Sequence, residues 1–175
     1  MSDALVTAQV LTDLGHINLR GDRGDAAFVA AVEAVCTMPL PKALTATSAG
    51  DLRIYWLGPD EWSLVTSADK AAALQAALNQ ALAGQHVAVN DLSATFVALR
   101  LAGDKARDVL AKGCTLDLHP AAFASGACAQ TGLAKAGVLL AAHDSEFRII
   151  VRRSFASYLL QWLGAAGAEY GIEFD

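Results

Sequence analysis

The sequence is poor in the residues that build disulfides and metal centres. Its 175 residues include three cysteines, and no two of them have the CxxC spacing. This usage fits a reducing compartment better than a disulfide framework. The four histidines are isolated from one another and from the cysteines. Because a zinc or iron site needs three or four converging ligands, we expect no bound metal.

Long apolar runs and leader signals are also missing. The first residues carry no basic stretch followed by an apolar segment, and the most apolar stretch, 133–142, is interrupted by Lys135. A helix that crosses a bilayer needs about 20 predominantly apolar residues. We therefore expect a cytoplasmic protein that does not bind a membrane.

Charged residues are few, and acidic residues slightly outnumber basic ones. Charged residues form 18% of the chain, and the formal net charge at pH 7 is −5. The 13 basic residues are scattered, and we interpret the tight pair Arg152-Arg153 as the exposed end of a strand. Non-specific nucleic-acid binding requires clustered lysine and arginine, so we expect no nucleic-acid partner.

What the sequence does contain is an internal repeat. Leu19-Arg20-Gly21-Asp22 recurs as Leu101-Ala102-Gly103-Asp104, and Glu61-Trp62-Ser63-Leu64-Val65 recurs as Glu146-Phe147-Arg148-Ile149-Ile150. The spacing between the two segments is similar in both halves of the chain. A repeat of this kind indicates two copies of one supersecondary unit.

Apolar periodicity and turn residues predict the order β-α-β-β-α-β in each half, which is the ferredoxin-like order. We expect helix caps at Asp25, Ser67, Asp104 and Ser154. The expected elements of the first half are one or two strands within 6–20, a helix over 25–36, a polar loop over 42–50, strands over 52–57 and 61–66, a helix from 67 to about 83 and a strand over 87–92. Those of the second half are a strand over 96–101, a helix over 104–112, a loop over 114–125, one long, bulged strand within 128–143, a strand over 147–152, a helix over 154–164 and a strand over 171–174.

No linker rich in serine, glycine or proline separates the halves. The predicted fold class is therefore α+β, with two pseudo-symmetric ferredoxin-like halves, 1–92 and 93–175, packed as one compact unit.

Few positions suggest chemistry, and each has a structural interpretation. Asp91 and Ser93 stand at a strand end, where an acid beside a hydroxyl can hold a pterin or an amine. The alternative, which the spacing favours, is a turn in which both side chains cap backbone groups. The segment Gly21–Asp25 lacks the spacing of phosphate-binding loops and is interpreted as a turn and a helix cap.

The cysteines and tryptophans also have two interpretations. Cys114 and Cys128 are nucleophile candidates only if a base or a helix N-terminus activates them, and we favour small apolar residues. Trp56 and Trp62 flank a hairpin turn, which favours packing across the strands over a role as interface anchors. We therefore assign no catalytic residue.

An ordered set of segments resembles a known family, the gamma subunit of heterotetrameric sarcosine oxidase. The resemblance extends over roughly residues 14–163. A wider similarity connects Asp91-Leu92-Ser93 and the stretch 99–103 to the folate-binding aminomethyltransferases, although Asp104 and Thr115 stand where proline is usual. The segments that carry the resemblance are Trp56–Trp62, Asp91–Ser93, Gly103, Ala106–Cys114, Leu116–Pro120, Phe123, Cys128–Thr131 and Arg153–Tyr158.

The resemblance implies a fold and a role. The implied fold is the folate-binding domain of the aminomethyltransferases. The implied complex oxidatively demethylates sarcosine to glycine, produces hydrogen peroxide and transfers the one-carbon unit to tetrahydrofolate. The resemblance places FAD, FMN, NAD, tetrahydrofolate and zinc in the alpha, beta and delta subunits, and no cofactor in this chain.

We therefore expect a non-catalytic, structural subunit of such a complex. The alternative is a free-standing binding module for folate or a related one-carbon carrier, with Asp91 and Ser93 as its weak site candidates. A third hypothesis is a small independent enzyme that uses Cys114 or Cys128.

Overall fold

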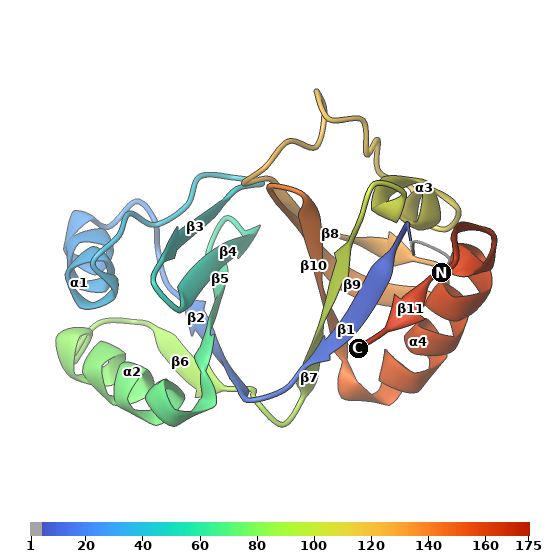
Figure 1. Ribbon diagram of the computed structural model, residues 1–175. Coiled ribbons are helices and arrows are strands. Elements are labelled where there is room, and N and C mark those ends of the chain that lie inside the picture. Colours follow the sequence, from blue (N-terminus) through green and yellow to red (C-terminus); the bar gives the residue numbers. More distant parts are fainter. Residues whose placement is uncertain (1–4) are drawn as a thin grey trace. The chain divides into compact units, whose positions relative to one another are not determined.

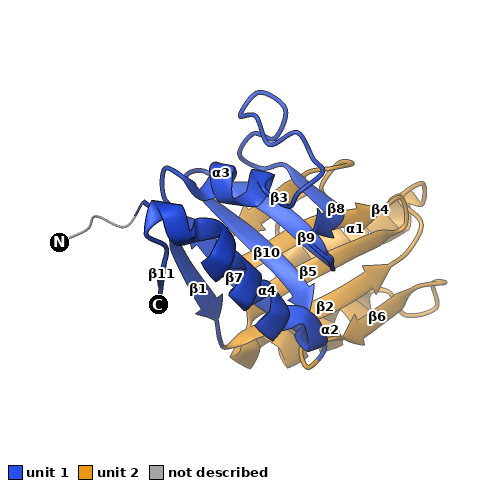
Figure 2. Cartoon of the chain, turned by 90° about the vertical axis from the view of Figure 1, so that its right-hand side faces the viewer, with its two compact units in different colours: residues 1–12, 95–175 blue, residues 13–94 orange. Residues whose placement is uncertain are grey.

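The computed structural model describes residues 5–175, which form two compact units. Unit 2 is the continuous stretch 13–94, and unit 1 combines the residues up to 12 with residues 95–175 (Figure 2). Each unit has its own sheet and its own buried core.

Unit 2 is a five-stranded antiparallel sheet with two helices. Its strands lie in the order β3-β4-β5-β2-β6. Ile17 and Leu19 alternate along β2 and point into the core, where Phe28 and Val32 of α1 meet them. The elements are β2 (Leu14–Arg20), α1 (Ala26–Cys36), β3 (Ala46–Ala49), β4 (Leu52–Gly58), β5 (Glu61–Ser67), α2 (Ala68–Ala81) and β6 (Ala88–Asp91).

Unit 1 is a six-stranded sheet in the order β11-β1-β7-β10-β9-β8, also with helices (Figure 1). Leu99 and Leu101 of β7 and Phe147 of β10 are buried in its core together with Leu159 of α4. The elements are β1 (Thr7–Leu11), β7 (Phe96–Ala102), α3 (Ala106–Ala111), β8 (Cys128–Leu133), β9 (Ala136–His143), β10 (Glu146–Arg152), α4 (Arg153–Gly167), the 3₁₀ turn η1 (Ala168–Tyr170) and β11 (Glu173–Phe174).

The predicted fold class is confirmed. Unit 2 follows the ferredoxin-like order as β2-α1-β4-β5-α2-β6, with β3 added at an edge, and unit 1 follows it as β7-α3-β9-β10-α4-β11, with β1 and β8 added. The repeated segments occupy equivalent registers. Leu19 pairs with Trp62 across β2 and β5, and Leu101 pairs with Phe147 across β7 and β10.

The division of the chain differs from the expected boundary between residues 92 and 93. Residues 7–11 form β1, which pairs along its whole length with β7 of unit 1. Val6 and Ala8 are buried in the core of unit 1, whereas β2, only a few residues later, belongs to unit 2. The chain turns between the two strands at Asp13, whose φ is 58°.

Two strand predictions were wrong. The long strand expected within 128–143 is a hairpin of β8 and β9, which turns at Ala134 and Lys135. Apolar residues flank Lys135 on both sides at this turn, and one polar side chain in an apolar stretch does not by itself indicate a turn. The polar loop expected over 42–50 contains the short edge strand β3, which pairs with β4.

The helix caps were predicted correctly in part. Asp25 caps α1, because its carboxylate accepts hydrogen bonds from the backbone N–H groups of Ala27 and Phe28. Ser67 stands at the N-cap of α2, but its hydroxyl makes no capping bond. The caps expected at Asp104 and Ser154 were wrong, since α3 and α4 start after Lys105 and Arg152.

Candidate functional site

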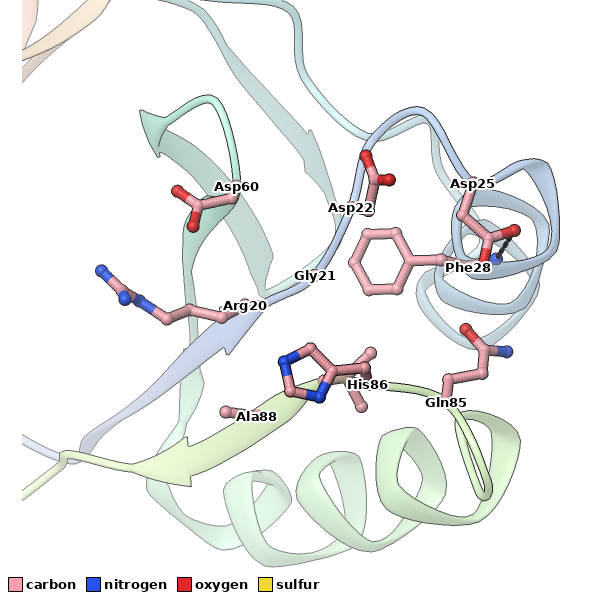
Figure 3. Close-up of a pocket in the computed structure, with 10 residues that line it drawn as sticks. Arg20, Gly21, Asp22, Asp25, Phe28, Asp60, Gln85, His86 and Ala88 are labelled. Atoms are coloured by element: carbon pink, nitrogen blue, oxygen red, sulfur yellow. Dashed lines mark hydrogen bonds between the residues drawn. The ribbon is translucent and has the colours of Figure 1, made fainter.

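A concave site of about 650 Å³ opens at one end of unit 2 (Figure 3). Three segments that are distant in the sequence form it: the end of β2 with the turn into α1, the turn between β4 and β5, and the segment that enters β6. Its lining residues are Arg20, Gly21, Asp22, Asp25, Phe28, Asp60, Gln85, His86, Val87 and Ala88.

Local hydrogen bonds hold the turn between β2 and α1. The Asp22 carboxylate accepts a bond from the Gly24 backbone N–H at 2.7 Å, and Asp25 caps the helix. This first turn places the Phe28 ring directly against Gly21, where a methyl group would overlap it. Behind Phe28 lies Trp62, with 5.7 Å between the ring centroids. The interpretation of this segment as a turn and a cap is confirmed.

Trp62 also resolves one alternative left open by the sequence. It pairs with Trp56 across β4 and β5, and its side chain is fully buried in the core of unit 2. The two tryptophans therefore pack within the unit, as predicted.

Hydrogen-bond acceptors dominate the site. Asp22, Asp25 and Asp60 contribute carboxylates, and the side-chain oxygen of Gln85 is buried without a hydrogen-bond partner among the described residues. Arg20 contributes a positive charge to the lining of the site, and its guanidinium donates a hydrogen bond to the Glu61 carboxylate at 2.8 Å. Hydrogen bonding to Glu61 raises the pKa of Arg20. The side-chain oxygens of the site can therefore accept hydrogen bonds from a ligand that carries donor groups or a positive charge.

The lining residues do not assemble a nucleophile beside a general base. Sequence reasoning singled out the Gly21–Asp25 side of this site but missed residues 85–88. The feature of the sequence that could have identified residues 85–88 is their position between the end of a helix at Gly84 and the following strand.

The structure places Asp91 and Ser93 away from this site, at the opposite end of β6 from Ala88. The Asp91 carboxylate accepts hydrogen bonds from the hydroxyl and the backbone N–H of Ser93, the latter at 2.8 Å. The Ser93 hydroxyl oxygen in turn accepts a hydrogen bond from the backbone N–H of His16 at 3.0 Å. Hydrogen bonds from Ser93 lower the pKa of Asp91. Both side chains therefore hold a turn beside β2.

The cysteines lie in separate surroundings. Cys36 and Cys128 are buried, and burial raises the pKa of the Cys36 thiol to about 11. The sulfur of Cys114 lies 4.0 Å from the hydroxyl oxygen of Thr131. Within residues 5–175, histidine, cysteine and acidic side chains form no group of three or more that suits a metal ion. None of the helices over these residues has the length and apolar character needed to cross a membrane.

A solved structure that is distant in sequence shares the fold of this chain. The glycine cleavage system aminomethyltransferase T from Bartonella henselae superposes with a TM-score of 0.72 at 18% sequence identity, covering 99% of this chain and 48% of that one. The fold is therefore the one that this aminomethyltransferase shares.

The family follows from the sequence. Residues 20–169 match the model of the sarcosine oxidase, gamma subunit family. The sarcosine oxidase subunit gamma of Corynebacterium sp. (strain P-1) is 36% identical over 160 residues, covering 90% of this chain and 78% of that protein. The chain belongs to the sarcosine oxidase gamma subunit family, as the ordered set of segments indicated.

A solved assembly contains a similar chain. In the heterotetrameric sarcosine oxidase from Corynebacterium sp. U-96, in complex with pyrrole 2-carboxylate, one chain matches with a TM-score of 0.88 at 33% identity. The match covers 95% of this chain and 85% of that chain. The chain is accordingly a subunit of an oxidoreductase complex.

Proposed function

We propose that the chain is the structural gamma subunit of a heterotetrameric sarcosine oxidase and takes no direct part in the chemistry. The observation that carries this proposal is the match to a chain of such an oxidase over nearly the full length of both chains. The complex would demethylate sarcosine to glycine with oxygen, produce hydrogen peroxide and pass the one-carbon unit to tetrahydrofolate.

In this proposal the partners are the alpha, beta and delta subunits, and the complex works in the cytoplasm. FAD, FMN, NAD, tetrahydrofolate and zinc are bound by those partners. The chain would cover and position the larger subunits. A fold shared with an enzyme does not carry the chemistry of that enzyme, because function depends on the particular side chains of the site.

The uses of the polar side chains support a structural role. Asp25 caps a helix and Asp91 holds a turn. Glu61 and Glu146, the repeated acids, each bond to an arginine on the neighbouring strand, Arg20 and Arg100 respectively. Groups committed to the fold in this way are poorly placed to exchange protons with a substrate.

Cys128, one of the two cysteines that the independent-enzyme hypothesis names, and Cys36, which that hypothesis does not name, both fit a structural role. Both are buried, and the raised pKa of Cys36 keeps its thiol protonated at neutral pH. A thiolate, and not a thiol, is the nucleophile in cysteine catalysis.

Co-purification tests the proposed function. A tagged chain expressed in its native cells, grown on sarcosine, should recover large flavin-containing subunits and sarcosine oxidase activity. An untagged strain grown in the same way is the control for non-specific recovery. Recovery of the tagged chain alone would refute the assignment.

The residues proposed for folate do not fit a ligand role well. One Asp91 oxygen already accepts two hydrogen bonds from Ser93, and the Ser93 hydroxyl also accepts the His16 N–H. We therefore propose that both serve the turn and that the isolated chain has no folate site at these residues. Titration calorimetry with tetrahydrofolate should give no binding heat. Binding that Asp91→Asn abolishes, with the melting temperature preserved, would instead support the folate module.

A further inference from the structure

The connection between α3 and β8, residues 112–127, contains neither helix nor strand, yet it is tightly held to unit 1. Figures 1 and 2 show it extending beyond the sheet and α3. Long connections without secondary structure are uncommon in compact domains and usually serve a function. Residues 116–120 and Phe123 of this segment carry part of the family resemblance, which assigns them no role.

Two buried side chains and one arginine anchor the connection. Leu118 and Phe123 are each 6% exposed and belong to the core of unit 1. Arg107 of α3 donates from one nitrogen to the carbonyl oxygens of Leu118, at 2.5 Å, and Phe123, at 3.1 Å. Its guanidinium carbon also lies 4.9 Å from the centre of the Phe147 ring. Arg107 is therefore a positioning residue that clamps both ends of the stretch between the anchors.

Residues 119–122 lie between these anchors and form an exposed turn, here named the His119 turn. The His119 carbonyl oxygen accepts the N–H groups of Ala122, at 2.8 Å, and Phe123, at 2.9 Å. The Asp117 carboxylate accepts the backbone N–H of His119 at 2.9 Å. These bonds fix the turn before any partner arrives, which lowers the entropy lost on docking.

The His119 ring has a defined direction for hydrogen bonding. Its Nδ1 accepts the backbone N–H of Ala121 at 3.2 Å. In the neutral imidazole the proton then lies on Nε2, which makes the outer nitrogen a donor. The exposed residues beside it, Pro120, Ala121 and Ala122, are small and apolar.

Charged residues are few in the sequence around the turn. From Gly113 to Ala134 the sequence contains no lysine or arginine, and Asp117 is the single acid. Asp117 itself bonds to the His119 N–H. Depletion of charge is the compositional property that distinguishes the centre of a protein interface from the remaining surface.

We propose that the His119 turn docks into an apolar recess of a partner subunit of the oxidase, where a carbonyl or carboxylate oxygen accepts the His119 Nε2–H. This inference rests on the proposed function, since it requires a heterotetramer. Arg107 contributes indirectly, by holding the turn in the shape that docks.

A lysine scan across the two units tests the inference in the assembled complex. Ala122→Lys places a charge on the exposed turn and leaves both anchors intact. Ala73→Lys, at an exposed position of α2, makes the same change elsewhere and is the matched control. Native mass spectrometry of co-expressed subunits measures retention of the chain, and thermal unfolding of the isolated chain measures its folding.

We expect Ala122→Lys to weaken retention about tenfold or more, as burial of an unpaired charge in an interface does, with an unchanged melting temperature. Ala73→Lys should assemble like the unmodified chain. His119→Ala should weaken retention less than Ala122→Lys does. Arg107→Lys, which keeps the charge but not the planar guanidinium fork, should give a partial loss.

Two outcomes would overturn the inference. Normal assembly of both Ala122→Lys and His119→Ala would show that the turn contacts no partner. If Ala122→Lys instead left the heterotetramer intact and disrupted self-association of the isolated chain, the occupant would be a second copy. Failure of the unmodified chain to assemble would count against the proposed function, which distinguishes the two failures.

Discussion

The two units contain the same Gly-Asp step after their first ferredoxin-like strand, but the glycine is required for different reasons. In unit 2, Gly21 makes room for the ring of Phe28. In unit 1, Gly103 has a φ of 111°, and a side chain there would collide with the carbonyl of Leu5, which precedes β1. A repeated residue can thus be preserved through a fold while its physical role changes.

The second difference concerns the strand beside that step. In unit 2 the outer neighbour of β2 is β6, which follows in the sequence. In unit 1 the corresponding neighbour of β7 is β1, and β11, the sequential equivalent of β6, pairs with β1 over two residue pairs. Unit 1 therefore depends on a segment from the far end of the chain, whereas unit 2 is continuous.

Removal of β1 should have the largest effect on the stability of unit 1. It would show how strongly unit 1, unlike unit 2, depends on a distant segment of the chain. Deleting residues 1–12 takes Val6 and Ala8 from the core of unit 1 and leaves β7 paired with β10 but not with β1. We expect the amides of β7 and β10 to lose protection from hydrogen exchange, while those of β2 and β5 keep it.

Val10→Ala is the control for this deletion, because Val10 lies on the same strand and is 38% exposed. It should leave the exchange of both units unchanged. Retention of protected β7 amides after the deletion would mean that unit 1 folds without β1.

Replacing each of the two repeated glycines by alanine should have the next largest effect on stability. The two losses of unfolding free energy show which glycine is more strictly required. Gly103→Ala combines a strained φ with a backbone collision, and we expect it to cost about 3 kcal/mol or more of unfolding free energy. Gly21→Ala meets a side-chain ring and not the backbone, so about 1–2 kcal/mol is expected. Urea denaturation of both variants measures the difference.

Gly132→Ala is the matched control, since a methyl group there has open space. Its unfolding free energy should stay within about 0.5 kcal/mol of the unmodified chain. Equal losses at positions 21 and 103 would contradict the distinction between the two glycines.

The smallest predicted effect concerns Glu61, which begins the repeated hairpin strand in unit 2. A hydrogen bond from Arg20 is the main cause that lowers the pKa of Glu61 below its usual value of 4.5. The carboxylate therefore stabilises the folded state above pH 4.5, and this contribution is lost as the pH falls through the lowered pKa. Because the pair is partly exposed, Glu61→Gln should cost less than about 1 kcal/mol at pH 7.

Glu61→Gln should also show a shallower loss of stability than the unmodified chain below pH 4.5. Denaturation across acid pH measures this, and 1 M salt should narrow the difference at neutral pH. If stability fell equally below pH 4.5 in the two proteins, the hydrogen bond between Arg20 and Glu61 would contribute nothing to stability in solution.

The repeat and its hairpins were predictable because the relevant signals are local. The β-forming apolar residues of β4 and β5 and the turn at Gly58-Pro59-Asp60 define a hairpin without knowledge of the tertiary fold. Asp25 is likewise a local cap. The assignment of β1 and β2 to different sheets was not predictable, because both strands alternate in the same way and the choice of partner depends on residues beyond 90.

The candidate site was predictable only on one side. Asp22 and Asp25 stand out as a polar turn, but the wall formed by residues 85–88 and Asp60 is brought there by the sheet register. The anchoring of the His119 turn depends similarly on Arg107, whose two bonds connect α3 to positions 11 and 16 residues further along the chain. Neither arrangement leaves a periodic trace in the sequence.

The separation of β1 from β7 has a consequence for synthesis on the ribosome. Unit 2 can complete its sheet once Asp91 has emerged, whereas β1, made first, has no neighbour until β7 is translated. Domains generally fold as units in the order of synthesis, and unpaired strand edges favour aggregation. The newborn chain therefore carries an unpaired strand beside a finished unit during this interval, which exposes a strand edge to aggregation.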